Sequence, residues 1–549
     1  MTRADHAPRR IALALVALAF LLYGRTLGYG FLSYDDPDYV TENPAVVDGL
    51  SLVGLRWAFV AFHSSNWHPL TWLSHQLDCQ LFGLAGGAHH GTNVLLHALN
   101  AVLCFRFFLG TTNRLWPSAF VAAAFCLHPL RVESVAWVSE RKDLLSGSFF
   151  FLTLLAWARY VRAPSRGRYL LALAACAGGL LAKPGVIALP LVLVLVDLWP
   201  LGRPLEDGLR SLARLVLEKL PFLVLGLASA CVTVLAQRAG GALGSLAEIP
   251  LGERVANAFH AHLAYVGHTL LPLSLSYFYP HHAIVDAQSS PLRPSVVAGV
   301  LLVSGATLWA VRSVARGERA FGVGWLWFVV VLFPMVGIVQ VGDQSWANRY
   351  AYLSTIGLVA AVAFPAQRLA GARWIAGALL LLWAVLAWRE VEHWRDSRSL
   401  HLRALAVTER NYVAEAGYAN VLRAEGDVDG AREHYRRALE VYPDFPEALY
   451  SFGLLEQEAG DLQRAAELYL RAAELQPEHV GTHLNLGAVR GMQGRLEEAV
   501  EAFAVVLSLS PGQPAALHNL EGLRALARRP DADPRLRALL PRLDALLAP

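Results

Sequence analysis

The feature that most constrains this chain is a succession of about eleven apolar runs within its first 388 residues. A helix that crosses a bilayer needs about 17 to 25 mostly apolar residues, and each run reaches or approaches that length. The runs are 11–27, 92–110, 115–130, 144–161, 168–182, 184–200, 214–236, 294–311, 321–340, 350–367 and 373–388. We therefore expect an all-α, polytopic membrane domain over residues 1–388.

Charge divides the chain at the end of these runs. About 12% of the residues up to Trp388 are charged, against about 27% of the following 161. The first part fits lipid and the second fits water, so an ordinary soluble enzyme is excluded. The overall net charge of +3 averages the two parts and gives no indication of nucleic-acid binding. Four of the five cysteines lie in apolar runs and none forms a CxxC motif, so we expect no disulfide framework.

Positive charge predicts the orientation. Arg9 and Arg10 precede the first run, and no small-residue cleavage site follows it, so we interpret it as an uncleaved first helix rather than a signal peptide. Further arginine clusters follow alternate runs, and the positive-inside rule then gives a cytoplasmic amino terminus. On the side of the membrane opposite the cytoplasm, here called the far side, lie residues 31–91, 131–143, 237–293 and 341–349 and the charged carboxy-terminal region. The segment 255–273 could span, re-enter or lie in the interface, and this topology excludes a single full crossing for it.

The charged region carries a 34-residue repeat. Pro443, Pro477 and Pro511 recur at that interval. In blocks 412–445, 446–479 and 480–513, small residues recur at positions eight, fifteen and twenty, and an aromatic at position twenty-four. This pattern resembles the tetratricopeptide repeat, a pair of antiparallel helices, although the usual aromatic at position eleven is missing. We expect a linker helix or half repeat at 389–411 and capping helices after 513. The array is either a stabilising or oligomerising module or a concave groove that grips a peptide.

Ionisable residues beside apolar runs are candidates for function. Asp35 and Asp36 follow the first run, and a carboxylate there could act as a general base on a hydroxyl, although capping aspartates in a solvated loop are the alternative. A second far-side cluster, 128–143, contains Glu133 and Glu140, which are seven apart and would share a helix face. Its alternative is a network of surface ion pairs.

Basic side chains near the far side are candidates for binding a lipid phosphate. Arg349 directly precedes Tyr350 at the start of the tenth run, and Lys183 lies between the fifth and sixth runs. A guanidinium suits a phosphate, whereas snorkelling to the interface is the alternative. The chain has 19 histidines but no HExxH or other tight ligand spacing, so we expect no dedicated metal site.

Several short segments, in order and before a repeat array, resemble a known family. They include Ser33-Tyr-Asp-Asp36, Asn66-Trp-His-Pro-Leu-Thr-Trp72, His128-Pro-Leu-Arg-Val-Glu133, Lys183-Pro184 and Asn348-Arg-Tyr350. The chain resembles bacterial relatives of the transmembrane-and-tetratricopeptide-repeat protein O-mannosyltransferases, which are GT-C-type glycosyltransferases. The resemblance implies a GT-C-type helical bundle followed by a tetratricopeptide-repeat α-solenoid.

The resemblance also implies an activity: inverting transfer of a hexose such as mannose from a polyprenyl-phosphate donor to Ser/Thr hydroxyls of protein acceptors. It places the enzyme in a bacterial inner membrane, with transfer and repeats on the periplasmic side. The implied catalytic residues are Asp35, Asp36 and Glu133. The implied residues that bind donor and phosphate are Arg349, Lys183, His268, Arg141, His128 and Tyr352. Two positions depart from the family pattern, since His268 stands where lysine is frequent and Asn348 replaces an acidic residue.

Two alternatives remain open at this point. The chain could be a non-enzymatic membrane scaffold whose repeats assemble an envelope complex. It could also be a GT-C enzyme that modifies lipids or glycans, with the repeats recruiting partners. No cofactor besides the lipid-linked donor is indicated.

Overall fold

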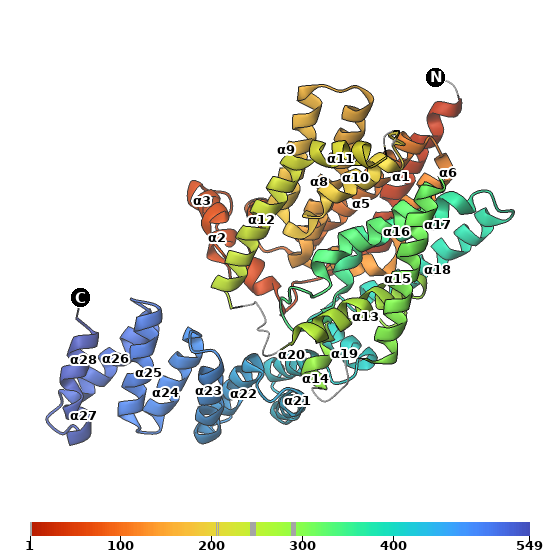
Figure 1. Cartoon of the computed structure of the whole chain (residues 1–549). Coiled ribbons are helices and arrows are strands. Elements are labelled where there is room, and N and C mark those ends of the chain that lie inside the picture. The colour runs from red at the N-terminus through yellow and green to blue at the C-terminus, as the bar shows by residue number, and fades with distance from the viewer. Residues whose placement is uncertain (1–2, 205, 207, 242–248, 287–291, 549) are drawn as a thin grey trace. The chain divides into compact units, whose positions relative to one another are not determined.

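The computed structural model describes residues 3–204, 206, 208–241, 249–286 and 292–548. These residues form two compact units, Met1–Thr408 and Glu409–Pro549. Both units are helical (Figure 1), which confirms the predicted all-α class. The strands within the described ranges are β1 (Tyr279–Pro280) and β2 (Gln344–Trp346), which pair antiparallel with Tyr279 opposite Trp346.

A helix occupies each of the eleven predicted runs. These helices are α1 (Arg3–Tyr23), α5 (Gly86–Thr112), α6 (Leu115–Leu127), α8 (Arg141–Arg162), α9 (Arg166–Ala182), α10 (Leu189–Leu198), α12 (Leu220–Ala239), α15 (Pro294–Ala315), α16 (Arg319–Leu332), α17 (Ala351–Ala366) and α18 (Ala372–Glu392). In the described part of the chain, 7 helices are long and apolar enough to cross a membrane, or 8 if α6 and the bent segment after it form one span. The chain is thus a multi-pass membrane protein, while the exact number of crossings stays a prediction.

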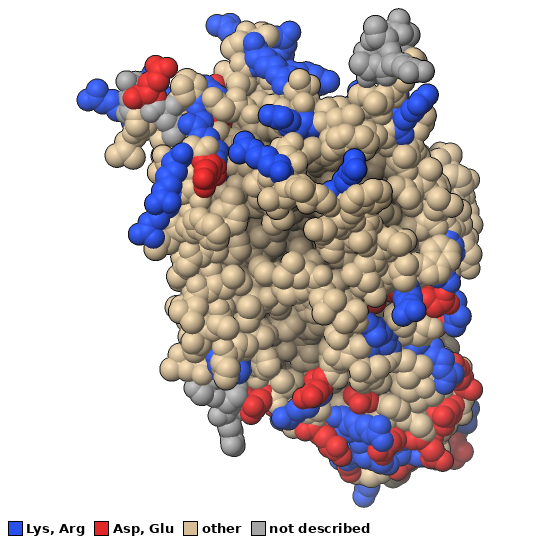
Figure 2. Space-filling model, turned by 90° about the vertical axis from the view of Figure 1, so that its right-hand side faces the viewer, with Lys and Arg blue, Asp and Glu red and all other residues tan. Residues whose placement is uncertain are grey.

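The surface of the first unit agrees with a membrane environment. On the face that Figure 2 shows, a broad band carries almost no charged side chains, and lysine and arginine gather at one end of it. Large apolar side chains are exposed on the long helices, among them Leu21, Leu301 and Leu381, each more than 65% exposed. In water such a surface would favour association, so the band fits contact with lipid.

Short elements connect the long helices and position the polar residues. They are η1 (Gly24–Gly28), η2 (Pro37–Thr41), α2 (Pro44–Val47), α3 (Leu52–Val60), α4 (Pro69–Phe82), η3 (Pro129–Arg131), α7 (Val132–Ala136), η4 (Val138–Glu140), η5 (Pro184–Val186), α11 (Leu209–Glu218), α14 (His282–Val285), η6 (Phe333–Met335) and η7 (Asn348–Tyr350). The 255–273 segment is a continuous helix, α13 (Leu251–Leu270), that packs beside α15. Residues 389–407 extend the first unit, because α19 (Ser397–Val407) contacts the loop after α1, where Ser33 Oγ lies 2.8 Å from Ser397 Oγ.

The second unit is a row of antiparallel helix pairs with the predicted 34-residue register (Figure 1). Its helices are α20 (Tyr412–Ala424), α21 (Val428–Val441), α22 (Pro446–Glu458), α23 (Leu462–Leu475), α24 (Val480–Met492), α25 (Leu496–Leu509), α26 (Pro514–Ala527), α27 (Pro534–Ala538) and α28 (Leu540–Leu546). The fifteenth-position glycines, Gly426, Gly460 and Gly494, have φ of 83°, 87° and 73°, a conformation that favours glycine and makes the turn within each pair.

The small residue at position eight and the aromatic residue at position twenty-four of each repeat pack against each other. A Cβ atom on Gly453 would lie 2.6 Å from Cε1 of Tyr469, and one on Gly487 would lie 2.7 Å from Cε1 of Phe503. Position eight must therefore be small because the position-twenty-four ring of the paired helix lies against it. At the variant position eleven, Glu456 pairs with Arg432 at 2.7 Å and Arg490 pairs with Glu498 at 3.0 Å. In the second and third repeats ion pairs thus stand where the repeat usually has an aromatic, and the first repeat has Leu422 at this position.

Candidate active site

Charged side chains from six segments of the first unit converge into one cluster. We call the set Asp35, Glu133, Glu140, Lys142, Asp143, Lys183 and Arg349 the charged cluster. Glu133 comes from α7, Glu140 from the end of η4, Lys142 and Asp143 from the first turn of α8, and Arg349 from η7. Lys183 ends α9 in an extended conformation, φ −159° and ψ 131°, because Pro184 disfavours helix at the preceding residue.

Arg349 joins the two glutamates. Its Nη1 lies 2.7 Å from Oε1 of Glu133, and its Nε lies 3.4 Å from Oε1 of Glu140. The two glutamates do not share a continuous helix as their spacing had predicted, because the backbone is extended at Trp137, φ −94° and ψ 120°, between α7 and η4. The bend nevertheless turns both carboxylates to one guanidinium.

Two lysines complete the cluster around Glu140. Lys142 Nζ lies 3.1 Å from Oε1 of Glu140, and Lys183 Nζ lies 3.1 Å from its Oε2. Lys183 also binds Oδ1 of Asp143 at 2.7 Å. Glu140 therefore faces three cations, and the cluster holds four carboxylates and three cations. A charged group packed this deeply requires such partners, because an unpaired buried charge is very costly.

The adjacent aspartates have different environments. Asp36 is fully buried, and its carboxylate accepts hydrogen bonds from Leu32 N at 2.8 Å, Ser139 N at 3.0 Å and Ser139 Oγ at 2.5 Å. Asp35 is half-buried, and its carboxylate has no hydrogen bond within the described ranges. Burial raises the pKa of Asp35 to about 6, although Lys142 and Arg349 favour its ionised form. The carboxylate of Asp36 thus connects the loop after α1 to the segment at Ser139, whereas the carboxylate of Asp35 is available to a ligand.

The other predicted binding residues are held away from the charged cluster by partners of their own. Arg141 pairs with Asp78 at 2.7 Å and donates to Asn93 and to the carbonyl of His89. His128 donates from Nε2 to the carbonyl of Thr269 at 3.0 Å and accepts from the amide of Leu130.

Tyr352 and His268 also lie outside the cluster's ion pairs. Tyr352 is buried, with its hydroxyl 3.0 Å from Asn100 Nδ2 and from His97 Nδ1. His268, on α13, packs its ring 6.1 Å from that of Tyr279, and its Nδ1 is buried without a hydrogen-bond partner in the described part of the chain.

The sequence singled out Glu140 with Glu133, but it did not single out two other cluster members, Lys142 and Asp143. Their signal was the density of charge between two apolar runs, which did not indicate which side chains turn to Arg349. Asn348, the departure from the family pattern, braces the same turn: it donates to the carbonyl of Ser276 at 2.8 Å and accepts from the hydroxyl of Tyr279 at 3.2 Å. Across the described ranges, no group of three or more His, Cys, Asp or Glu side chains is arranged to hold a metal ion.

The fold and the site define a class: a polytopic, all-helical membrane protein that carries tetratricopeptide repeats. The tetratricopeptide-repeat family matches residues 417–479 and 450–514. The chain is 34% identical over 195 residues to protein O-mannosyl-transferase Tmtc2 of Drosophila melanogaster, which covers 33% of this chain and 21% of that protein. It is 25% identical over 522 residues to human protein O-mannosyl-transferase TMTC1, and this alignment covers 82% of this chain and 57% of the human protein.

A Caenorhabditis elegans protein O-mannosyl-transferase is 23% identical over 460 residues, covering 80% of this chain and 64% of that protein. The chain is thus a relative of the transmembrane-and-tetratricopeptide-repeat protein O-mannosyltransferases. It spans about a fifth to two thirds of the length of these relatives.

Proposed function

We propose that this protein is a membrane glycosyltransferase that moves a hexose, such as mannose, from a polyprenyl-phosphate donor to Ser/Thr hydroxyls of protein acceptors. The observation that carries the proposal is the free carboxylate of Asp35 beside a cluster of three cations, in a chain related to protein O-mannosyl-transferases. A carboxylate with a pKa near 6 is suited to accept a proton at neutral pH.

In the proposed step Asp35 takes the proton of the acceptor hydroxyl. The hydroxyl oxygen forms a bond to the anomeric carbon while the bond from that carbon to the phosphate oxygen breaks, so the configuration inverts. The electron pair leaves on the lipid phosphate. Arg349 and Lys183 stabilise the departing charge, with Lys142 as a third cation, because a planar guanidinium and an ammonium both bind phosphate oxygens well.

We also propose the sidedness and the role of the repeats. The positive-inside pattern supports a cytoplasmic amino terminus, with the charged cluster and the repeats on the far side of a bacterial inner membrane. The repeat unit would then present the acceptor polypeptide through its concave surface.

A transfer assay tests the base assignment. Full-length protein in lipid receives a polyprenyl-phosphate mannose donor and a Ser/Thr-rich acceptor protein, and product is measured by mass spectrometry. We expect Asp35→Asn to lower the transfer rate by about 100-fold or more, in line with loss of a general base. Asp38→Asn is the matched control, because Asp38 is an exposed acid of the same loop. Full activity of Asp35→Asn would refute the assignment.

Mass spectrometry of envelope proteins from a deletion strain separates the alternatives. Loss of hexose from Ser/Thr sites supports transfer to protein. Changed lipid glycans with unchanged proteins would favour a lipid or glycan acceptor. No change in either, with loss of an envelope assembly, would favour the scaffold.

A further inference from the structure

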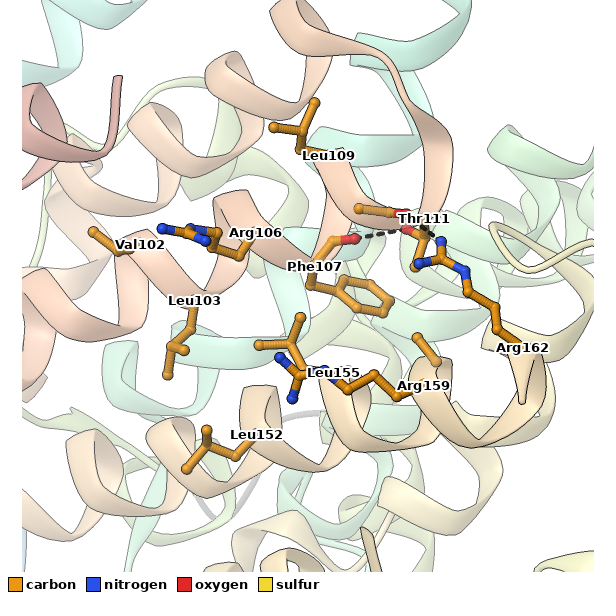
Figure 3. Close-up of a pocket in the computed structure, with 12 residues that line it drawn as sticks. Val102, Leu103, Arg106, Phe107, Leu109, Thr111, Leu152, Leu155, Arg159 and Arg162 are labelled. Carbon is orange, nitrogen blue, oxygen red and sulfur yellow. Dashed lines mark hydrogen bonds between the residues drawn. The ribbon is translucent and has the colours of Figure 1, made fainter. Parts of the chain in front are cut away.

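A second charged site lies far from the charged cluster, where α5 and α8 end. A cavity of about 580 Å³ opens between the last turns of these two helices, and Arg106, Arg159 and Arg162 line it (Figure 3). Arg159 is 18 residues beyond Arg141, so at 1.5 Å per residue it lies about 27 Å along α8 from the charged cluster. The hydrocarbon core of a bilayer is about 30 Å thick, so the cavity lies at the opposite membrane surface.

The charge in this cavity is unbalanced. Its lining contains three arginines and no acidic residue. Arg162 donates to the carbonyl of Gly110, whereas the side chains of Arg106 and Arg159 make no hydrogen bond or ion pair within the described ranges. Both side chains are exposed, so both guanidinium groups keep all their donors for a ligand.

Ordinary roles explain only part of this arrangement. Arg159 and Arg162 lie in the last turn of α8, where positive charge stabilises the helix dipole. Arg106 lies six residues before the end of α5, about 9 Å inside the helix end. Because α5 has 27 residues and is about 40 Å long, its end extends beyond the hydrocarbon core, and Arg106 lies near the membrane surface. The dipole of the last turn does not account for it, and an arginine beside a membrane span with no partner of its own is a candidate for binding an anion.

The lining also selects the kind of anion. Leu103, Leu152 and Leu155 form an apolar floor next to the arginines (Figure 3). Arginine forks bind phosphate oxygens in pairs, and basic pockets between membrane helices accept phospholipid head groups. We propose that this cavity binds the phosphate head group of an anionic membrane phospholipid, with its acyl chains against the leucines.

Lipid titration with native mass spectrometry tests the proposal. Full-length protein in neutral detergent is titrated with phosphatidylglycerol, with phosphatidylcholine and, separately, with inorganic phosphate. We expect saturable binding of phosphatidylglycerol in preference to phosphatidylcholine. The double variant Arg106→Gln/Arg159→Gln should weaken that binding by about 30-fold, at about fivefold per arginine.

The control is Arg312→Gln/Arg316→Gln, which removes the same charge from exposed arginines at the end of α15, outside the cavity. This variant should bind phosphatidylglycerol as the unmodified protein does. The charge-preserving Arg106→Lys/Arg159→Lys should bind more weakly than the unmodified protein and more tightly than Arg106→Gln/Arg159→Gln, because an ammonium keeps the charge but loses the paired donors of the guanidinium. Size-exclusion profiles check that each variant is folded. An equal loss in both glutamine variants would mean general surface attraction, and binding of inorganic phosphate without lipid preference would mean a soluble anion. Either result overturns the lipid site.

Discussion

The contacts of Asp36 predict a large loss of stability when its carboxylate is removed. In Asp36→Ala, two backbone amides and one hydroxyl lose their acceptor in a fully buried place. Each hydrogen bond to a charged acceptor contributes about 1.5 to 3 kcal/mol, and relief of carboxylate burial offsets part of the sum. We expect a net cost of about 3 to 5 kcal/mol in the free energy of unfolding.

Asparagine at the same position should cost less. Its amide oxygen can still accept from Ser139, but its NH₂ group would face the amide of Leu32, so one hydrogen bond is lost, at about 2 kcal/mol. The control is Asp35→Asn, whose carboxylate makes no hydrogen bond in the described part of the chain and whose change should cost under about 1 kcal/mol.

Thermal unfolding of the purified full-length protein in detergent, followed by tryptophan fluorescence, measures these effects. The unfolding temperature should fall in the order Asp35→Asn, Asp36→Asn, Asp36→Ala, with a drop of at least about 5 °C for the last. If Asp36→Ala melted within about 1 °C of the unmodified protein, the fastening role of Asp36 would be wrong.

Three further predictions follow from other contacts. The transfer rate should fall about tenfold per pH unit below about pH 6 and level off above it, because a protonated Asp35 cannot accept the proton of the hydroxyl. A pH profile of the transfer rate at saturating donor measures this effect, and a flat profile would contradict it. Arg349→Lys should raise the KM for the lipid donor by about tenfold, since an ammonium loses the paired donors of the guanidinium; donor titration measures it, and an unchanged KM would place the phosphate elsewhere. Gly487→Ala should destabilise the repeat unit by about 1 to 3 kcal/mol, because the added Cβ atom would lie 2.7 Å from the ring of Phe503. Gly522→Ala is the control: its Cβ atom would meet open space, so this change should be neutral or stabilising. Thermal unfolding of the two full-length variants compares them.

The repeats could be predicted in detail because their constraints are local and periodic. A small residue at position eight and a ring at position twenty-four recur with the helix pair, and the contact of Gly453 with Tyr469 is the physical reason. Position eleven was different: the pairing of Glu456 with Arg432 joins helices of adjacent repeats, and the sequence pattern alone did not indicate it.

The charged cluster could be predicted only in part. Asp35, Glu133, Lys183 and Arg349 stood beside apolar runs, where a charge calls for a partner, and the structure brings Glu133 and Arg349 to 2.7 Å. The orientations of side chains along 128–143 depend on the bend at Trp137, and helical spacing does not describe that bend. Arg141 was expected at the site from the family resemblance, and in the structure its guanidinium pairs with Asp78.

The two adjacent aspartates have different roles: Asp36 fixes the position of the loop, and Asp35 is available to accept a proton. Three donors hold the carboxylate of Asp36 in a fully buried place, so a substrate hydroxyl cannot reach it, although burial raises the pKa of this carboxyl above its usual value. The same bonds fix Ser139, the residue directly before Glu140, and so position the carboxylate that gathers Lys142, Lys183 and Arg349. Asp35 lies next to this fixed point without hydrogen bonds of its own, so its position is set while its proton affinity remains available for chemistry. A general base needs both properties, and the DD pair supplies them through neighbouring residues.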